Sequence, residues 1–172
     1  MRDSFVAMSD LATITIELVS SPTAGVRALV SELEATLAAE YPPEQRHGLP
    51  LEAIFQPHIR FFVVRIDGVA VGCGGVALFD DFAEVKRMYV REGARGRGAA
   101  QALLARLEAE ARAAGLDLLR LETGDAQLAA IRFYQKCGFR RCGAFGDYAK
   151  MPPSSIVTSD FFEKRLVDDG DR

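Results

Sequence analysis

The chain carries the alternating segment Glu84-Val85-Lys86-Arg87-Met88-Tyr89-Val90, followed closely by Arg95-Gly96-Arg97-Gly98-Ala99-Ala100. The first segment predicts a β-strand, and the second opens an Ala- and Leu-rich pattern that is typical of a helix. The first N–H groups of a helix have no partner within the helix, and the helix dipole adds partial positive charge there. A strand, a basic glycine turn and a helix start together predict an anion site, which we interpret as a cradle for phosphate or pyrophosphate.

The residues of the turn support this interpretation. Gly96 and Gly98 let the backbone approach a ligand without an intervening Cβ, and Arg95 and Arg97 add planar guanidinium groups that suit phosphate. The turn lacks the Gly-Lys-Ser/Thr ending of a P-loop and the third glycine of a dinucleotide-binding fingerprint. We therefore expect a phosphate-carrying ligand that needs no metal. Taken alone, the hexapeptide could also be a solvated turn with two arginines.

The composition is that of one globular domain. The chain has 172 residues, of which 49% are hydrophobic and 26% charged, enough for a single core. A net charge of −3 argues against a nucleic-acid partner. No apolar run approaches the roughly 20 residues of a membrane span, and no secretory signal is visible. Unpatterned cysteines and scarce histidines predict reduced thiols, no metal site and a cytoplasmic location.

The hydrophobic pattern predicts strands that alternate with helices. We expect strands at 13–19, 61–66, 69–79, 82–90, 118–122, 139–145 and 161–167, and helices at 26–40, 49–55, 98–114 and 126–137. Asp67-Gly68 predicts a two-residue hairpin turn, and glycines 72, 74 and 75 indicate a bulge or close packing. This order predicts an α/β fold with a mixed, mostly antiparallel central sheet of about six to seven strands and helices on both faces.

The same patterns set the expected limits of the domain. Residues 10–168 form the predicted domain, residues 169–172 a short tail, and residues 1–9 a flexible N-terminal extension in which Met8 is the expected natural start.

The two motifs resemble those of the GNAT superfamily of N-acetyltransferases. Arg95-x-x-Gly98-x-Ala100 is similar to the Gln/Arg-x-x-Gly-x-Gly/Ala loop with which that family binds acetyl-CoA, and Met88-Tyr89-Val90 is similar to the strand end before it. Residues 127–139 resemble the second family motif, with its Ala, Tyr and terminal Gly-Phe in register. The resemblance implies that strand 82–90 splays from strand 118–122 and that acetyl-CoA lies in the gap.

The resemblance also implies which residues hold acetyl-CoA. The backbone around Arg95, Gly96, Arg97, Gly98, Ala99 and Ala100 would bind the pyrophosphate. The backbone of Met88 and Val90 would pair with pantetheine much like an added strand. Gln127 stands where many relatives have an Asn that contacts pantetheine, and Lys136 is either a phosphate contact or a solvated residue at a helix end.

Two residues are candidates for proton transfer. Acetyl transfer to an amine requires that the amine be neutral and that the departing thiolate receive a proton. Glu84 lies where some relatives carry a glutamate that acts as base through water; the alternative is a solvent-facing residue paired with Lys86 or Arg132. Tyr134 is the predicted general acid for the thiolate, and the alternative is a core tyrosine with a satisfied hydroxyl.

The predicted acceptor contacts are Tyr41, Arg46 and His47, around the break at Pro42-Pro43, together with Tyr148. The predicted activity is that of an acyltransferase. It moves an acetyl group from acetyl-CoA to a primary amine of a small molecule, or to an exposed protein or peptide amine, by direct attack in a ternary complex. The alternative function is a non-catalytic acyl-CoA-binding regulatory module. A homodimer is compatible with either function.

Overall fold

The computed structural model describes residues 11–167. The extension predicted at 1–9 and the tail predicted at 169–172 lie outside the described residues. The strands are β1 (Ile14–Val19), β2 (Ile59–Ile66), β3 (Val69–Leu78), β4 (Ala83–Val90), β5 (Leu118–Gly124), β6 (Arg140–Cys142) and β7 (Ser159–Arg165). The helices are α1 (Ala24–Glu40), α2 (Ala99–Ala113) and α3 (Leu128–Lys136), and short 3₁₀ helices lie at Pro43–Gln45, Leu51–Phe55, Glu92–Ala94, Gly146–Lys150 and Pro153–Ser155.

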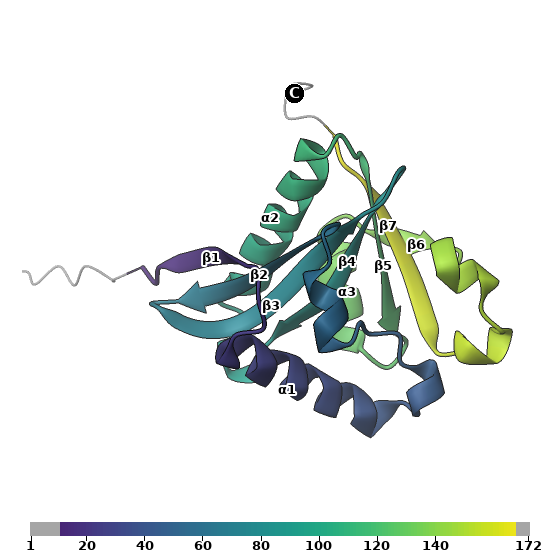
Figure 1. Ribbon diagram of the computed structural model, residues 1–172, viewed down its shortest axis with the longest axis horizontal. Helices are drawn as coiled ribbons and strands as arrows, with labels where there is room; N and C mark the ends of the chain where they lie inside the picture. The colour runs from purple at the N-terminus through teal and green to yellow at the C-terminus, as the bar shows by residue number, and fades with distance from the viewer. Residues whose placement is uncertain (1–10, 168–172) are drawn as a thin grey trace, which may run out of the picture.

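One seven-stranded sheet organises the molecule, in the order β1-β2-β3-β4-β5-β7-β6 (Figure 1). Neighbouring strands are antiparallel except for β4 and β5, which run parallel. The predicted mixed, mostly antiparallel sheet is therefore confirmed. No helix within residues 11–167 combines the length and apolarity needed to cross a bilayer.

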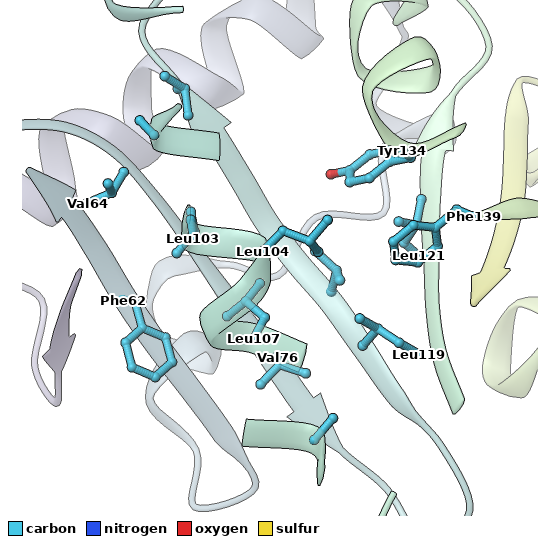
Figure 2. Packing of buried hydrophobic residues seen from close by; sticks show 14 of the residues in the cluster. Phe62, Val64, Val76, Leu103, Leu104, Leu107, Leu119, Leu121, Tyr134 and Phe139 are labelled. Atoms are coloured by element: carbon cyan, nitrogen blue, oxygen red, sulfur yellow. The ribbon is translucent and has the colours of Figure 1, made fainter. Parts of the chain in front are cut away.

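Strand β2 shows why helices cover both faces of this sheet. Its apolar run is buried on both sides, because successive side chains of a strand point to opposite faces. Phe62 and Val64 pack with Leu103 of α2 (Figure 2), whereas Phe61 and Val63 pack in the cluster that includes α1. Helices α1 and α2 accordingly lie on opposite sides of β2–β4 (Figure 1). Burying each such Phe or Leu side chain contributes roughly 1.5–3 kcal/mol to folding.

Local signals account for several element boundaries. The Thr23 hydroxyl accepts the N–H of Val26 at 3.3 Å and caps α1. Asp67 and Gly68 have φ angles of 49° and 82°, as a two-residue hairpin between β2 and β3 requires, so that turn is confirmed.

Two predicted elements are corrected. The strand expected at 139–145 is only Arg140–Cys142, because Phe145 leaves the sheet and packs with Tyr148 and Phe161. The helix expected at 49–55 is instead a short 3₁₀ helix, Leu51–Phe55, which places Ile54 in the core beside α1.

Candidate active site

Strands β4 and β5 separate soon after they begin. Their register contains only the pairs Ala83–Leu119 and Glu84–Arg120, although β4 continues to Val90 and β5 to Gly124. Because the two strands are parallel, their carboxyl ends open to the same side, and helices α2 and α3 begin shortly after those ends. Ligands commonly bind at this kind of position in α/β sheets.

A cleft occupies this opening. Its two sides are the β4 residues 84–88 and the β5 residues 121–124. Gln127, Ala130 and Tyr134 close it next to α3, and the outer wall comes from α1, from residues 45–49 and from Tyr148. We refer to this space as the cleft and to residues 95–100 as the glycine loop.

The glycine loop leads from β4 into α2. Gly96 and Gly98 have φ angles of 77° and 88°, left-handed conformations that glycine adopts at little cost. Gly98 is the N-cap and offers no side chain to the helix, and the first backbone bond of α2 runs from the Ala102 N–H to the Gly98 carbonyl. The N–H groups of residues 99–101 are therefore available to an external anion.

The two arginines of the loop differ in their surroundings. Arg95 turns back, and its Nε donates to the carbonyl of Val90 at 3.1 Å. Arg97 is exposed beside the helix start. Arg95 therefore fixes the loop onto the end of β4, whereas no hydrogen bond or ion pair within residues 11–167 engages Arg97.

A bulge shapes the β4 side of the cleft. Gly75 pairs with Lys86 and Cys73 pairs with Tyr89, so that Arg87 and Met88 together face Gly74. Arg87 takes a φ of 53° at this point. A Cβ at Gly74 would lie 3.3 Å from the Met88 Cα, which explains why glycine is present there. The bulge or close packing expected from the glycines of β3 is thus confirmed.

The Arg87 side chain links the bulge to the outer wall of the cleft. Its Nε donates to the Leu49 carbonyl at 2.8 Å, and its guanidinium pairs with Glu34 of α1 at 2.9 Å. A methyl group at Gly48 would overlap this guanidinium. Segment 45–49 is therefore held against β4 by one buried arginine.

Tyr134 reaches into the cleft from α3. The residue is 7% exposed, and Figure 2 shows its hydroxyl pointing away from Leu121 and Phe139. Within residues 11–167 this hydroxyl makes no hydrogen bond, so it is free to meet a ligand in the cleft. Burial raises the pKa of Tyr134, which keeps the phenol protonated and available as a donor.

Glu84 forms a closed triad with Lys86 and Tyr148. The Lys86 ammonium lies 2.8 Å from Glu84 Oε1, and the Tyr148 hydroxyl donates to the same oxygen at 2.7 Å. Lys86 also donates to the Tyr148 oxygen at 2.9 Å. The pairing with Lys86 matches the alternative expected from the sequence. Glu84 does not face solvent, however, because it is only 4% exposed.

Glu122 presents a second carboxylate from the opposite strand. It lies on β5 opposite Phe161 of β7 and lines the cleft. None of the ion pairs formed within residues 11–167 includes it. Burial raises the pKa of its carboxyl group, and this effect outweighs the opposing influence of Ser159 and of the charges on His47 and Lys86.

The predicted acceptor residues gather on the outer wall. The Tyr41 hydroxyl accepts the N–H of Ala126 at 2.8 Å, which ties the end of α1 to the start of α3. His47 Nε2 lies 2.7 Å from the Ser155 carbonyl oxygen. Because a carbonyl can only accept, the Nε2–H group donates this hydrogen bond. Arg46 is half-buried, and its Nε is shielded from solvent without a hydrogen-bond partner among the described residues.

The cleft brings together eight of the sixteen site residues predicted from the sequence: Glu84, Met88, Gln127, Tyr134, Tyr41, Arg46, His47 and Tyr148. The six residues of the glycine loop lie beyond it, at the end of β4. Val90 lies near that loop, and Lys136 is exposed at the far end of α3.

Among the cleft residues that were not predicted as part of the site, three are charged: Lys86, Arg87 and Glu122. Alternation along β5 could have indicated Glu122, because Leu119 and Leu121 are buried on one face and Glu122 must point to the other. Nothing in the sequence shows that segment 45–49 and Tyr148 cover that other face.

Known proteins share this architecture. The sequence model of the Acetyltransferase (GNAT) family matches residues 27–139, which contain both strands beside the cleft. The chain is 43% identical over 149 residues to the IAA acetyltransferase of Azospirillum brasilense, covering 86% of this chain and 97% of that protein.

Solved structures show the same fold. A Klebsiella pneumoniae protein assigned as an acyl-CoA N-acyltransferase matches with a TM-score of 0.70 and 34% identity, over 90% of this chain and 99% of that one. The PaiA N-acetyltransferase of Thermoplasma acidophilum, solved with coenzyme A, matches with a TM-score of 0.67 and 18% identity, over 90% and 99%.

Proposed function

This chain belongs to the acetyltransferase (GNAT) family and is an acyltransferase that uses acetyl-CoA, and we propose that its acceptor is a primary amine bound in the cleft. The acceptor is a small molecule or an exposed peptide amine that reaches the cleft past the outer wall. The observation that carries this proposal is that Tyr134 lines the cleft between β4 and β5 together with the two carboxylates Glu84 and Glu122.

The residues at the carboxyl end of β4 fit the donor substrate. The N–H groups that begin α2 and the Arg97 guanidinium match the charge of a pyrophosphate, and Gly96 and Gly98, both at positive φ, place no side chain between the ligand and the backbone. The bulged backbone of Met88 and the amide of Gln127 line the path from the loop into the cleft. A thioester bound along this path supplies an activated acetyl group.

The chemistry then needs two proton movements. The amine must lose a proton before its nitrogen lone pair can attack the thioester carbonyl, and the departing sulfur must be neutralised. Tyr134 donates a hydrogen bond to the sulfur as negative charge develops on it. Burial raises the pKa of Tyr134, so its phenolate is unfavourable. Tyr134 therefore gives up its proton to the sulfur only if the phenolate regains a proton from the reacting nitrogen.

Glu84 is the base predicted from the sequence, but its triad favours a positioning role. Its Oε1 already pairs with the Lys86 ammonium at 2.8 Å and accepts a hydrogen bond from the Tyr148 phenol. The triad instead fixes Tyr148 and therefore the outer wall of the cleft.

A thiol-release assay tests the function. Purified protein, acetyl-CoA and a panel of amino acids, polyamines, aminoglycosides and peptide N-termini are mixed, and free CoA is measured against time. We expect acceptor-dependent release for at least one class. Acetyl-CoA binding by calorimetry without release for any amine would instead favour the non-catalytic binding module.

A further inference from the structure

The cleft holds two carboxylates with contrasting surroundings. Glu84 on β4 is engaged by Lys86 and Tyr148, both through one oxygen. Glu122 on β5 faces the same cleft from the other side, with no ion pair among residues 11–167. A general base must have a carboxylate oxygen within reach of the substrate proton. Glu122 lines the cleft without an ion pair among residues 11–167, whereas Lys86 and Tyr148 both hold Oε1 of Glu84.

We propose that Glu122 is the catalytic residue that accepts the proton of the acceptor amine, on the assumption that the proposed acetyl transfer is correct. The groups that face it are Lys86 and Glu84 on β4, His47 on the outer wall, Tyr134 on α3 and Tyr148. Tyr134 therefore lines the same cleft as the proposed base, which brings a proton donor and a proton acceptor to one opening.

The proposed reaction moves three protons in all. An ammonium acceptor loses its first proton to the Glu122 carboxylate, and the free nitrogen attacks the thioester carbonyl to form the C–N bond. The C–S bond breaks, and the sulfur takes the proton of Tyr134. The second nitrogen proton returns to the Tyr134 oxygen, and Glu122 releases its proton to water, which leaves the amide, free CoA thiol and one proton.

Paired substitutions separate the two carboxylates. Glu122→Gln and Glu84→Gln each remove one carboxylate at nearly constant size, and kcat/KM is measured against pH for the best acceptor. The base works in its ionised form, so activity falls as pH drops through its pKa. Because burial raises the pKa of Glu122, this acidic limb should lie above the range of an ordinary carboxyl group.

We expect Glu122→Gln to remove the acidic limb and to lower kcat/KM near neutral pH by roughly 10²-fold or more, while Glu84→Gln keeps the limb. A limb that survives Glu122→Gln overturns the proposal. If Glu122→Gln does not fold, Glu122→Asp decides: it should keep a limb with a reduced kcat, and an undiminished kcat overturns the proposal. Wild-type protein that releases no thiol with any amine contradicts the proposed function itself.

A separate observation concerns the chemistry of the acceptor. Arg46 lines the cleft, and its buried Nε has no partner within residues 11–167. The other cations of the cleft are engaged, Lys86 with Glu84 and Arg87 with Glu34. A half-buried guanidinium without an anion is costly unless a ligand supplies one.

We infer that the acceptor carries a carboxylate that pairs with Arg46, so that the substrate class is an amino acid or another amino-carboxylate. Leu33, Leu37 and Leu49 line the same wall and suit an apolar side chain on that acceptor. This inference also rests on the proposed function, and it is independent of the identity of the base.

Matched acceptors test this second inference. Leucine, leucinamide and isoamylamine share an apolar chain and an amine, but only leucine has a free carboxylate. We expect a preference of at least roughly 10-fold in kcat/KM for leucine, lost in Arg46→Met through a higher KM for the acceptor. Equal use of the three amines overturns the inference. So does an Arg46→Met variant in which only the KM for acetyl-CoA rises, because the arginine would then serve the donor.

Discussion

The glycine loop and the outer wall of the cleft are built in opposite ways. The loop presents backbone N–H groups from one continuous segment, residues 95–101, and needs left-handed φ angles at two glycines. The wall presents side chains from α1, from segment 45–49 and from Tyr148, which come together only in the folded chain. A site made of backbone depends on local conformation, whereas a site made of side chains depends on packing between distant segments.

This difference predicts that substitutions in the two regions affect different kinetic parameters. Loop variants should change the binding of acetyl-CoA, and wall variants should change the binding of the acceptor. A catalytic residue outside both regions should change turnover alone.

Tyr134→Phe is the substitution with the largest expected effect. Tyr134 lines the cleft from α3 and belongs to neither region, so kcat should fall by roughly 10²–10⁴-fold while acetyl-CoA affinity and acceptor KM stay near wild type. Stopped-flow turnover together with calorimetric titration measures both. Wild-type turnover in the folded variant would show that the hydroxyl has no part in the reaction.

Gly98→Val should have the next largest effect. A β-branched residue at a φ of 88° costs about 1–3 kcal/mol, so the helix start must move and acetyl-CoA affinity should fall roughly 10-fold or more. Gly93→Val is the matched control, because a Cβ there meets no atom within 4 Å and its φ is not positive. Equal affinities for the two variants, measured by calorimetry, would contradict the cradle.

Gly48→Ala should have the smallest effect and should change only the wall. The added methyl group displaces the Arg87 guanidinium from Leu49 and Glu34, so acceptor KM should rise roughly 3–10-fold while acetyl-CoA affinity is unchanged. Gly143→Ala, with open space around its Cβ, serves as the control. If Gly48→Ala weakens acetyl-CoA binding instead of acceptor binding, the expectation that the loop and the wall serve different substrates is wrong.

The same difference explains what the sequence could predict. Gly96, Gly98 and the Asp67–Gly68 turn act through local backbone geometry, so their conformations follow from residue type and neighbours. The Glu84–Tyr148 hydrogen bond joins residues 64 positions apart, and no periodicity reports such a contact. The exposure of Glu122 to the cleft depends on the splay of β4 from β5, which only the resemblance implied.

Strand β6 is shorter than the sequence predicted for a related reason. Residues 139–145 have a strand-like pattern, but Phe145 is drawn into the aromatic cluster with Tyr148 and Phe161. Packing between distant aromatic residues outweighs the local preference of that segment.

The short pairing between β4 and β5 divides the sheet into two half-sheets, β1–β4 and β5–β7–β6, joined along only two residue pairs. Each half therefore carries an internal edge whose peptide groups face the cleft rather than a neighbouring strand. If the amide-bearing arm of acetyl-CoA lies along these edges, as we propose, it bridges the two half-sheets, and the donor substrate should then stabilise the fold as well as supply the acetyl group. Amide hydrogen exchange along residues 85–90 and 121–124 would then slow together when acetyl-CoA binds, and the two halves would unfold as one cooperative unit instead of two.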